Sequence, residues 1–299
     1  MSSASRFDLR LLSRRRVAEQ CVCCGSEVLT AAPAVLMPFV AHRALGWAPA
    51  VIDDSWGLRT IKSGLAYTVC RSLQCAACGL LFCDIRFSDD EMARLYKDYR
   101  GLDYTALREL YEPDYRRRNE ALQGQIEYGE SLTGFLCPLL PKRSLAILDW
   151  GGDSGKNTPL RSRAKQHDVY DISKAKVIPG ARAVTREQAS GQNYDLIVCS
   201  NVLEHVPYPN ALLEDIIHVM APSTLLYVEV PYEDVMRQYG GNAIAHKKHW
   251  HEHVNFFSPR AMNTLLANVG LQVVAASTEA TITAGLKSSY MMQVACRLT

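Results

Sequence analysis

Four cysteines are spaced as two pairs that could hold a metal ion. Each pair encloses two residues and precedes a glycine: Cys21 and Cys24 before Gly25, and Cys75 and Cys78 before Gly79. Four thiolates are the ligands of a structural zinc ion, and a glycine after each pair permits the turn that points backbone amides at the sulfurs. We therefore predict a zinc site. Among the ten cysteines, Cys23 and Cys70 are competing ligands, and four free buried cysteines are the alternative.

A second concentration of reactive side chains lies near residue 250. Four histidines and a glutamate fall close together there: His246, His249, His251, Glu252 and His253. Histidine suits a general base because its unperturbed pKa, roughly 6.5, is near neutrality. We expect His253 to be the base, while metal ligation and a solvated loop are the alternatives. His205, in the sequence LEHVP, is either an auxiliary base or a structural residue at a helix start.

The segment LAILDWGGDSGKNTPL, residues 145–160, connects an apolar run to a glycine cluster. The apolar run predicts a buried parallel strand that ends near Asp149. The glycines allow tight turns and close approach of a ligand: Gly151, Gly152 and Gly155. The polar residues after them could open a helix, and a strand, a glycine turn and a helix N-terminus together form a nucleotide-binding cradle. An ordinary surface turn is the alternative.

Strands and helices alternate after this segment. Apolar runs bounded by turn residues predict strands over 168–172, 182–184, 194–199, 224–230, 271–276 and 289–296. Amphipathic patterns predict helices over 209–220 and after Ser258, which caps its helix with Pro259 at the first position. This alternation predicts an α/β fold with a doubly wound sheet.

The segment before the sheet is predicted to be helical. Ser88 and Glu91 form a capping box. The following segment, 99–116, is rich in tyrosine and arginine, which predicts an amphipathic helix against a neighbour, or a lid over a pocket. A further helix is expected over about 119–135. We divide the chain into a disordered leader (1–20), a zinc-ribbon-like module with an apolar insertion (21–87), a helical linker or lid (88–142) and the α/β domain (143–299).

Composition narrows the classes of partner. The chain has 299 residues, 48% of them hydrophobic, and a net charge of +2. This charge gives no strong attraction to nucleic acid or to an anionic membrane. There is no uninterrupted apolar span of the length that a membrane helix needs, and no apolar signal core. We expect a cytoplasmic protein without a membrane span.

Residues 145–299 resemble the class I S-adenosylmethionine-dependent methyltransferases. Four stretches carry the resemblance: ILDWGGDSG, DVYDIS, YDLIVCSNVLEHVPYP and HEHVNFFSPRAMNTLLANVGLQVV. The resemblance implies a Rossmann-like seven-stranded sheet with S-adenosylmethionine at its edge. It implies that the cofactor lies against Asp149 and the three glycines, that Asp171 binds the ribose hydroxyls, and that Ser200 and Asn201 border the methionine moiety. Asp153 departs from the family pattern, which usually has a smaller residue there.

The zinc-like module before such a domain resembles the arrangement in sugar C-methyltransferases. That resemblance implies that Glu252 orients or charge-tunes His253, that His253 takes the acceptor's proton, and that His205 assists or anchors the substrate. The acceptor would be a sugar, a nucleotide-sugar or a glycan precursor, methylated on carbon or oxygen. Because the cofactor is already activated, the protein mainly aligns the acceptor, excludes water and removes a proton.

Two other functions are alternatives. A nucleic-acid methyltransferase could use the zinc module to bind RNA or DNA. The near-neutral net charge argues against this alternative, because phosphate contacts need clustered basic residues. A degenerate methyltransferase fold could bind a partner through the apolar insertion.

Overall fold

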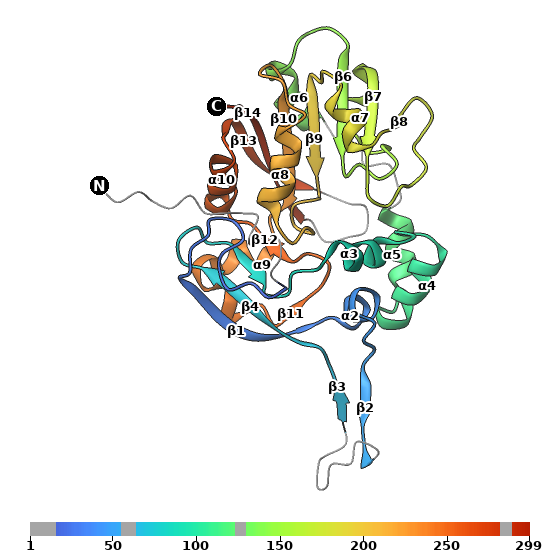
Figure 1. Ribbon diagram of the computed structural model, residues 1–299, viewed down its shortest axis with the longest axis vertical. Coiled ribbons are helices and arrows are strands. Elements are labelled where there is room, and N and C mark those ends of the chain that lie inside the picture. The colour runs from blue at the N-terminus through green and yellow to red at the C-terminus, as the bar shows by residue number, and fades with distance from the viewer. Residues whose placement is uncertain (1–15, 55–63, 123–129, 282–288) are drawn as a thin grey trace, which may run out of the picture.

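The computed structural model describes residues 16–54, 64–122, 130–281 and 289–299, and it contains two principal sheets. Figure 1 shows the larger sheet and its helices at one end of the molecule and the smaller sheet at the other. The predicted leader, insertion and 119–135 helix lie partly outside the described residues.

The larger sheet has seven strands and confirms the predicted α/β fold. Its spatial order is β13 (Leu271–Thr281), β14 (Ser289–Leu298), β10 (Leu225–Pro231), β9 (Leu196–Ser200), β6 (Leu145–Trp150), β7 (Ala164–Tyr170) and β8 (Arg182–Ala183). Strands β10, β9, β6, β7 and β8 are parallel to one another, and β14 is antiparallel to both of its neighbours. Because β6 pairs with β7 on one side and β9 on the other, the chain order reverses at β6. In such sheets, ligands bind at the carboxyl ends of the strands beside this reversal.

The central strands are buried on both faces, as continuous apolar runs require. On one face, Leu148 and Ile197 pack with α8 (Pro209–Ile217) and α10 (Pro259–Asn268). On the other face, Ile147 and Val198 pack with α6 (Glu130–Leu136), which the 3₁₀-helix η2 (Cys137–Leu139) follows. The short helix α7 (Arg186–Ser190) adds Ala189 to the first face. Ser258 caps α10 as predicted, since its side chain accepts from the amide of Ala261.

The predicted helix after the glycine turn is wrong. Residues 151–163, all of them described, contain only the 3₁₀-helix η3 (Arg161–Arg163). Three residues interrupt a helix here. Gly155 and Leu160 adopt left-handed φ angles of 75° and 56°, and a residue before proline, here Thr158, is disfavoured in helical geometry. Tight turns therefore connect β6 to β7.

The smaller sheet combines both ends of the chain. Its order is β11 (His249–Trp250), β1 (Leu29–Leu36), β4 (Val69–Cys75), β5 (Leu81–Cys83) and β12 (Asn255–Phe256). The two edge strands, β11 and β12, come from beyond residue 143, so the predicted division at that position does not describe this sheet. In Figure 1 they are the orange strands beside the blue and cyan ones, and the hairpin of β2 (Ala50–Ile52) and β3 (Gly64–Ala66) projects away.

Four helices pack beside the smaller sheet: α2 (Pro38–Leu45), α3 (Asp89–Tyr96), α4 (Leu102–Tyr111) and α5 (Tyr115–Leu122). The capping box of Ser88 and Glu91 is confirmed at the start of α3. The region predicted as one helix over 119–135 contains the end of α5 and most of α6, with residues 123–129 outside the described part. Helix α9 (Asp234–Tyr239) and the 3₁₀-helix η4 (Gly240–Ala245) precede β11. A separate apolar core joins these elements, including Phe39, Leu95, Tyr104 and Trp250.

In the described part of the chain, no helix combines the length and the apolar character needed to cross a lipid bilayer.

Candidate active site

A cavity of about 320 Å³ opens at the carboxyl ends of β6, β7 and β9. Gly151, Asp171 and Asn201 contribute the sheet side of its wall, and Tyr96 and Tyr99 contribute the opposite side from α3 and the turn after it. The volume is in the range of small-molecule sites. The cavity therefore lies where the strand order predicts a ligand, between the larger sheet and the helical region predicted as a linker or lid.

The glycine turn leaves space where a side chain would not fit. Gly151 has a φ of 80°, and a Cβ there would lie 2.5 Å from Cγ2 of Val202. Gly155 has a φ of 75°, and a Cβ there would lie 2.7 Å from Cγ2 of Val169. Both positions combine a left-handed backbone with a close neighbour, so they require glycine. Only Gly151 of the three predicted glycines lines the cavity.

Asp149 lies beneath the turn and does not line the cavity. Its carboxylate is 5% exposed and accepts a hydrogen bond from the hydroxyl of Thr158, which also contacts Nε2 of His167 at 2.8 Å. Burial raises the pKa of Asp149 to about 7, with a further contribution from the charges of Asp171 and Asp153. In this structure Asp149 holds the turn in place.

Asp171 lies at the cavity end of β7. Its two carboxylate oxygens accept from the backbone amides of Asp153 and Ser173, at 2.9 and 2.7 Å. These bonds orient the side chain in the cavity wall. Asp153 lies next to it, and burial and the Asp171 carboxylate raise the pKa of Asp153. The acid that departs from the family pattern is therefore on the cavity wall beside Asp171.

Ser200 and Asn201 lie at the end of β9. The Ser200 hydroxyl donates to the buried Glu229 at 2.7 Å, and the Asn201 amide donates to Ser200 at 3.0 Å. Tyr227 and Gln293 donate to the other oxygen of Glu229. Asn201 lines the cavity, whereas Ser200 is held behind it. Asn201 has a left-handed φ of 55°, which turns the chain from β9 toward the segment that contains His205.

His205 lines the cavity and meets Tyr96 of α3. Its Nδ1 lies 2.7 Å from the Tyr96 hydroxyl and 3.3 Å from the backbone oxygen of Glu252. Burial, together with the proximity of His253, lowers the pKa of His205 to about 3. This histidine is therefore neutral at physiological pH.

His253 lies against His205, with ring centroids 4.6 Å apart. Its Nδ1 is 2.8 Å from Oε1 of Glu233, a partner that sequence reasoning missed. Burial disfavours the charged ring, but the Glu233 hydrogen bond and nearby carboxylates outweigh it and raise the pKa of His253. The carboxylate adjacent in space, rather than the one adjacent in sequence, orients this ring.

Glu252 does not hydrogen-bond His253, so of its two predicted roles, orienting or charge-tuning this ring, only charge-tuning agrees with the contacts. Both of its oxygens accept from Arg108, at 3.0 and 2.9 Å, and one also accepts from Tyr104. Burial opposes ionisation, yet His251 and Arg108 hold the pKa of Glu252 well below its usual value. Glu252 joins α4 to the loop between β11 and β12, and it acts on His253 only through its charge.

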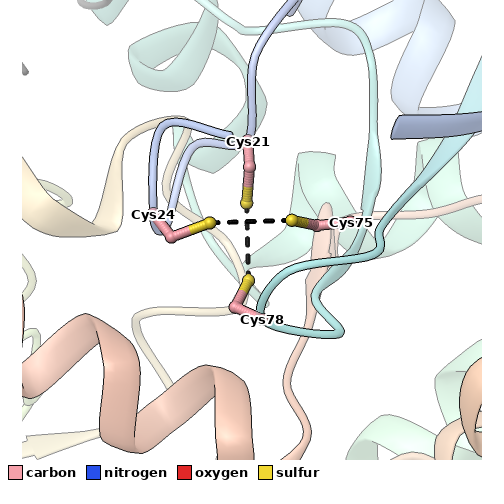
Figure 2. A group of neighbouring side chains, drawn as sticks. All are labelled: Cys21, Cys24, Cys75 and Cys78. Atoms are coloured by element: carbon pink, nitrogen blue, oxygen red, sulfur yellow. Dashed lines mark hydrogen bonds between the residues drawn. The ribbon is translucent and has the colours of Figure 1, made fainter. Parts of the chain in front are cut away.

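The four predicted zinc ligands converge, as Figure 2 shows. The Sγ atoms of Cys21 and Cys78 are 3.6 Å apart, and so are those of Cys24 and Cys75. Tetrahedral zinc with bonds of ~2.3 Å would place its sulfurs roughly 3.8 Å apart, so the geometry fits this ion. Neither competing cysteine belongs to this group of four. Cys23 lies beside Cys21 and Cys78 and also contacts the backbone oxygen of Ala261, and Cys70 lies beside Cys83.

Sequence reasoning missed Tyr96 and Glu233 because their partners are distant in the chain. Tyr96 is not among the predicted site residues, although its hydroxyl contacts a site histidine. Glu233, two residues beyond the end of β10, carried a usable signal: polar residues after parallel strands gather at one edge of a sheet.

Comparison with known proteins gives one family match. A family model described as a methyltransferase domain matches residues 116–276, more than half of the chain. No curated protein matches. Among solved structures, the chain is similar to 1,6-didemethyltoxoflavin-N1-methyltransferase of Burkholderia thailandensis, with 14% identity over 66% of this chain and 90% of that one, and a TM-score of 0.44. It is also similar to magnesium protoporphyrin IX methyltransferase of Synechocystis, with 14% identity, 70% and 100% coverage, and a TM-score of 0.43.

Proposed function

Because the chain belongs to the methyltransferase-domain family and is an S-adenosylmethionine-dependent methyltransferase, we propose that it methylates a small molecule. The acceptor is a sugar, a nucleotide-sugar or a glycan precursor. The observation that carries the proposal is the cavity at the reversal of strand order, where Gly151 and Asp171 meet the aromatic side chains of α3. A cavity of this size suits small-molecule ligands.

The residues of the cavity fit S-adenosylmethionine, which supplies an activated methyl group when bound. Gly151 leaves the space that a side chain would fill. Asp171, fixed by two backbone amides, can accept hydrogen bonds from ribose hydroxyls. Asn201 offers an amide donor at the end of β9, with Ser200 supporting it. Asp149 and Gly155 act indirectly, by shaping the turn.

His205 and His253 are the candidates for handling the acceptor. His253, oriented by Glu233, takes the acceptor's proton, and its raised pKa makes it a stronger base. Neutral His205 and the hydroxyl of Tyr96 position the acceptor at the cavity. Glu252 contributes by holding the loop that carries His253.

Zinc in the four-cysteine site has a structural role in this proposal. A zinc ion with four protein thiolates has no open position for a substrate. The site lies in the core that joins the cysteine turns to α10, so it would fix the smaller sheet against the larger one.

Calorimetric titration with S-adenosylmethionine tests the proposal. Asp171→Ala should weaken binding by at least about tenfold, since losing hydrogen bonds to a charged group costs roughly 1.5–3 kcal/mol. His253→Ala is the matched control. It should bind the cofactor like the wild type and transfer less methyl to a panel of sugar and nucleotide-sugar acceptors. Folded wild-type protein that binds no S-adenosylmethionine, with or without the panel, would contradict the proposal.

A further inference from the structure

Three side chains meet beside the cavity: Glu204, His205 and His253. Glu204 is 2% exposed, and within the described residues neither of its carboxylate oxygens has a hydrogen-bond partner. Its Oε1 lies 3.7 Å from Nε2 of His205, too far for a hydrogen bond. The cluster places a ring nitrogen of His253 within 4.8 Å of the other two groups. An unpaired buried carboxylate is costly, so this position needs an explanation.

The hydrogen bond of His253 identifies its free nitrogen. Nδ1 of His253 faces the carboxylate of Glu233, which accepts, so the ring proton is on Nδ1 and the lone pair is on Nε2. Nδ1 of His205 lies 2.7 Å from the Tyr96 hydroxyl, which can donate or accept, and 3.3 Å from the backbone oxygen of Glu252, so these contacts do not fix its tautomer. An imidazole lone pair of His253 and the unpaired carboxylate of Glu204 therefore belong to one cluster. Such a cluster attracts a positive charge, either a metal ion or a proton.

The surroundings of His253 favour the proton. Its Nδ1 is occupied by the Glu233 carboxylate, and a carboxylate that accepts from one ring nitrogen stabilises the charged ring. Tetrahedral metal bonds of ~2.0–2.2 Å to nitrogen and oxygen place neighbouring ligand atoms roughly 3.3–3.6 Å apart. The 3.7 Å separation between Glu204 and His205 is close to that range, so metal content is measured as well.

We propose that Glu204 is a positioning residue that stabilises the proton which His253 takes from the methyl acceptor. This inference rests on the proposed function and adds a residue to it. As the acceptor oxygen or carbon bonds the methyl carbon, its proton passes to Nε2 of His253. The electron pair of the broken carbon–sulfur bond stays on the sulfur. The resulting imidazolium lies between the carboxylates of Glu204 and Glu233, and 34% of the His253 side chain is exposed, so the proton can later pass to water.

The charges around His253 support this role. Glu204, Glu233 and Glu252 all raise its pKa. The loop holding His253 is fixed to Glu204 itself, because the amides of Val254 and Asn255 both donate to the Glu204 backbone oxygen, at 2.7 and 3.1 Å. Burial raises the pKa of Glu204 to about 7, whereas the charge of His253 acts in the opposite direction and favours the Glu204 carboxylate; the charges of Glu233 and Glu229 add to the effect of burial. Lys247 acts on Glu233, whose pKa it helps to lower.

Histidine-selective NMR titration measures how strongly Glu204 stabilises the protonated form of His253, and it needs no methyl acceptor. Glu204→Gln removes the charge and nearly preserves the shape. It should lower the pKa of His253 by roughly one pH unit, since an opposite charge within about 4–6 Å raises a histidine pKa by that order. The His253→Ala spectrum assigns the signal. Asp168→Asn is the matched control because Asp168 is also buried, on β7, but pairs with Arg182; it should leave the His253 pKa unchanged.

An unchanged His253 pKa in folded Glu204→Gln would overturn the inference. So would a second metal ion per chain, beyond the one in the cysteine site, that Glu204→Gln loses. If Glu204→Gln does not fold, the titration of His253 in the wild-type protein tests the inference instead. We expect His253 to titrate in two steps because it is coupled to Glu204. A single step at an ordinary histidine pKa would contradict the inference. Calorimetry with S-adenosylmethionine separates this failure from failure of the proposed function, since Glu204→Gln should bind the cofactor normally.

Discussion

At the residue scale, burial gives different roles to two aspartates that the sequence assigned to one site. Asp149 and Asp171 both follow strands of the parallel sheet. Asp149 is enclosed beneath the glycine turn, where it accepts a hydrogen bond from the Thr158 hydroxyl. Asp171 is held at the cavity by two backbone amides. Asp171 lines the cavity and Asp149 does not. Asp171 is therefore the proposed partner for ribose hydroxyls, and Asp149 supports the fold.

The burial of Asp149 predicts a stability that depends on pH. Its pKa rises from 3.8 to about 7 on folding, so the folded state holds its proton more tightly than the unfolded state. Stability should therefore fall as pH rises between about 4 and 7, by up to about 4 kcal/mol from this residue. Asp149→Asn, which cannot ionise, should reduce this loss. Urea unfolding at about pH 5 and about pH 8 measures it, and an equal loss in both proteins would contradict the prediction.

At the element scale, the connection from β6 to β7 forms the cavity with turns instead of a helix. Left-handed residues and a proline replace the expected helix, and the glycines keep the turn close to Val202 and Val169. A helix N-terminus therefore does not supply the donors here. The backbone amide of Asp153 instead fixes Asp171.

Gly151→Ala should damage the cofactor site through this turn. The left-handed φ costs roughly 1–2 kcal/mol for an alanine. The new Cβ would also lie 2.5 Å from Val202, which forces the turn to shift. We expect cofactor affinity to fall at least about tenfold. Gly180→Ala is the matched control, because Gly180 has a φ of 88° with nothing near its Cβ; it should lose stability but keep affinity. Equal affinities in the two variants would contradict the steric argument.

At the scale of the whole molecule, the two sheets are joined by a shared core and by exchanged segments. One apolar cluster includes Cys21, Cys78, Phe82 of the smaller sheet region, and Leu213 and Leu265 of the helices on the larger sheet. In return, β11 and β12 complete both edges of the smaller sheet. The loop between these two strands delivers His253 to His205. The histidine pair therefore depends on correct docking of both sheets.

Removing the predicted zinc ion should consequently destabilise the whole protein. Structural zinc contributes roughly 10 kcal/mol of binding free energy in small domains. Cys24→Ser should lose one zinc ion per chain, lower the melting temperature and weaken methyl transfer. Cys137→Ser is the matched control, since Cys137 lies outside the four-cysteine cluster. This variant should keep the zinc content of the wild type. Elemental analysis and thermal unfolding measure both effects. A Cys24→Ser protein with the wild-type zinc content would disprove the metal assignment.

The sequence by itself determined the features that depend on local pattern. Apolar runs predicted the parallel strands, Ser88 and Ser258 marked helix starts, and the glycine spacing identified the turn beside the cavity. Paired cysteines of the right spacing also identified a cluster that the structure brings together. Such features are readable because strand burial, helix capping and left-handed turns each restrict which residue types occur at a few neighbouring positions.

Only the tertiary structure decided which side chains meet. The family resemblance implied that Glu252 orients or charge-tunes His253, but Arg108 of α4 engages Glu252, and Glu233 approaches His253 from beyond β10. Tyr96 reaches His205 across more than a hundred residues, and the unpartnered Glu204 is recognisable only once its surroundings are known. The physical reason is that hydrogen bonds and charge effects act over a few ångströms of space. Strand pairing and packing set those distances, and the spacing of residues along the chain does not.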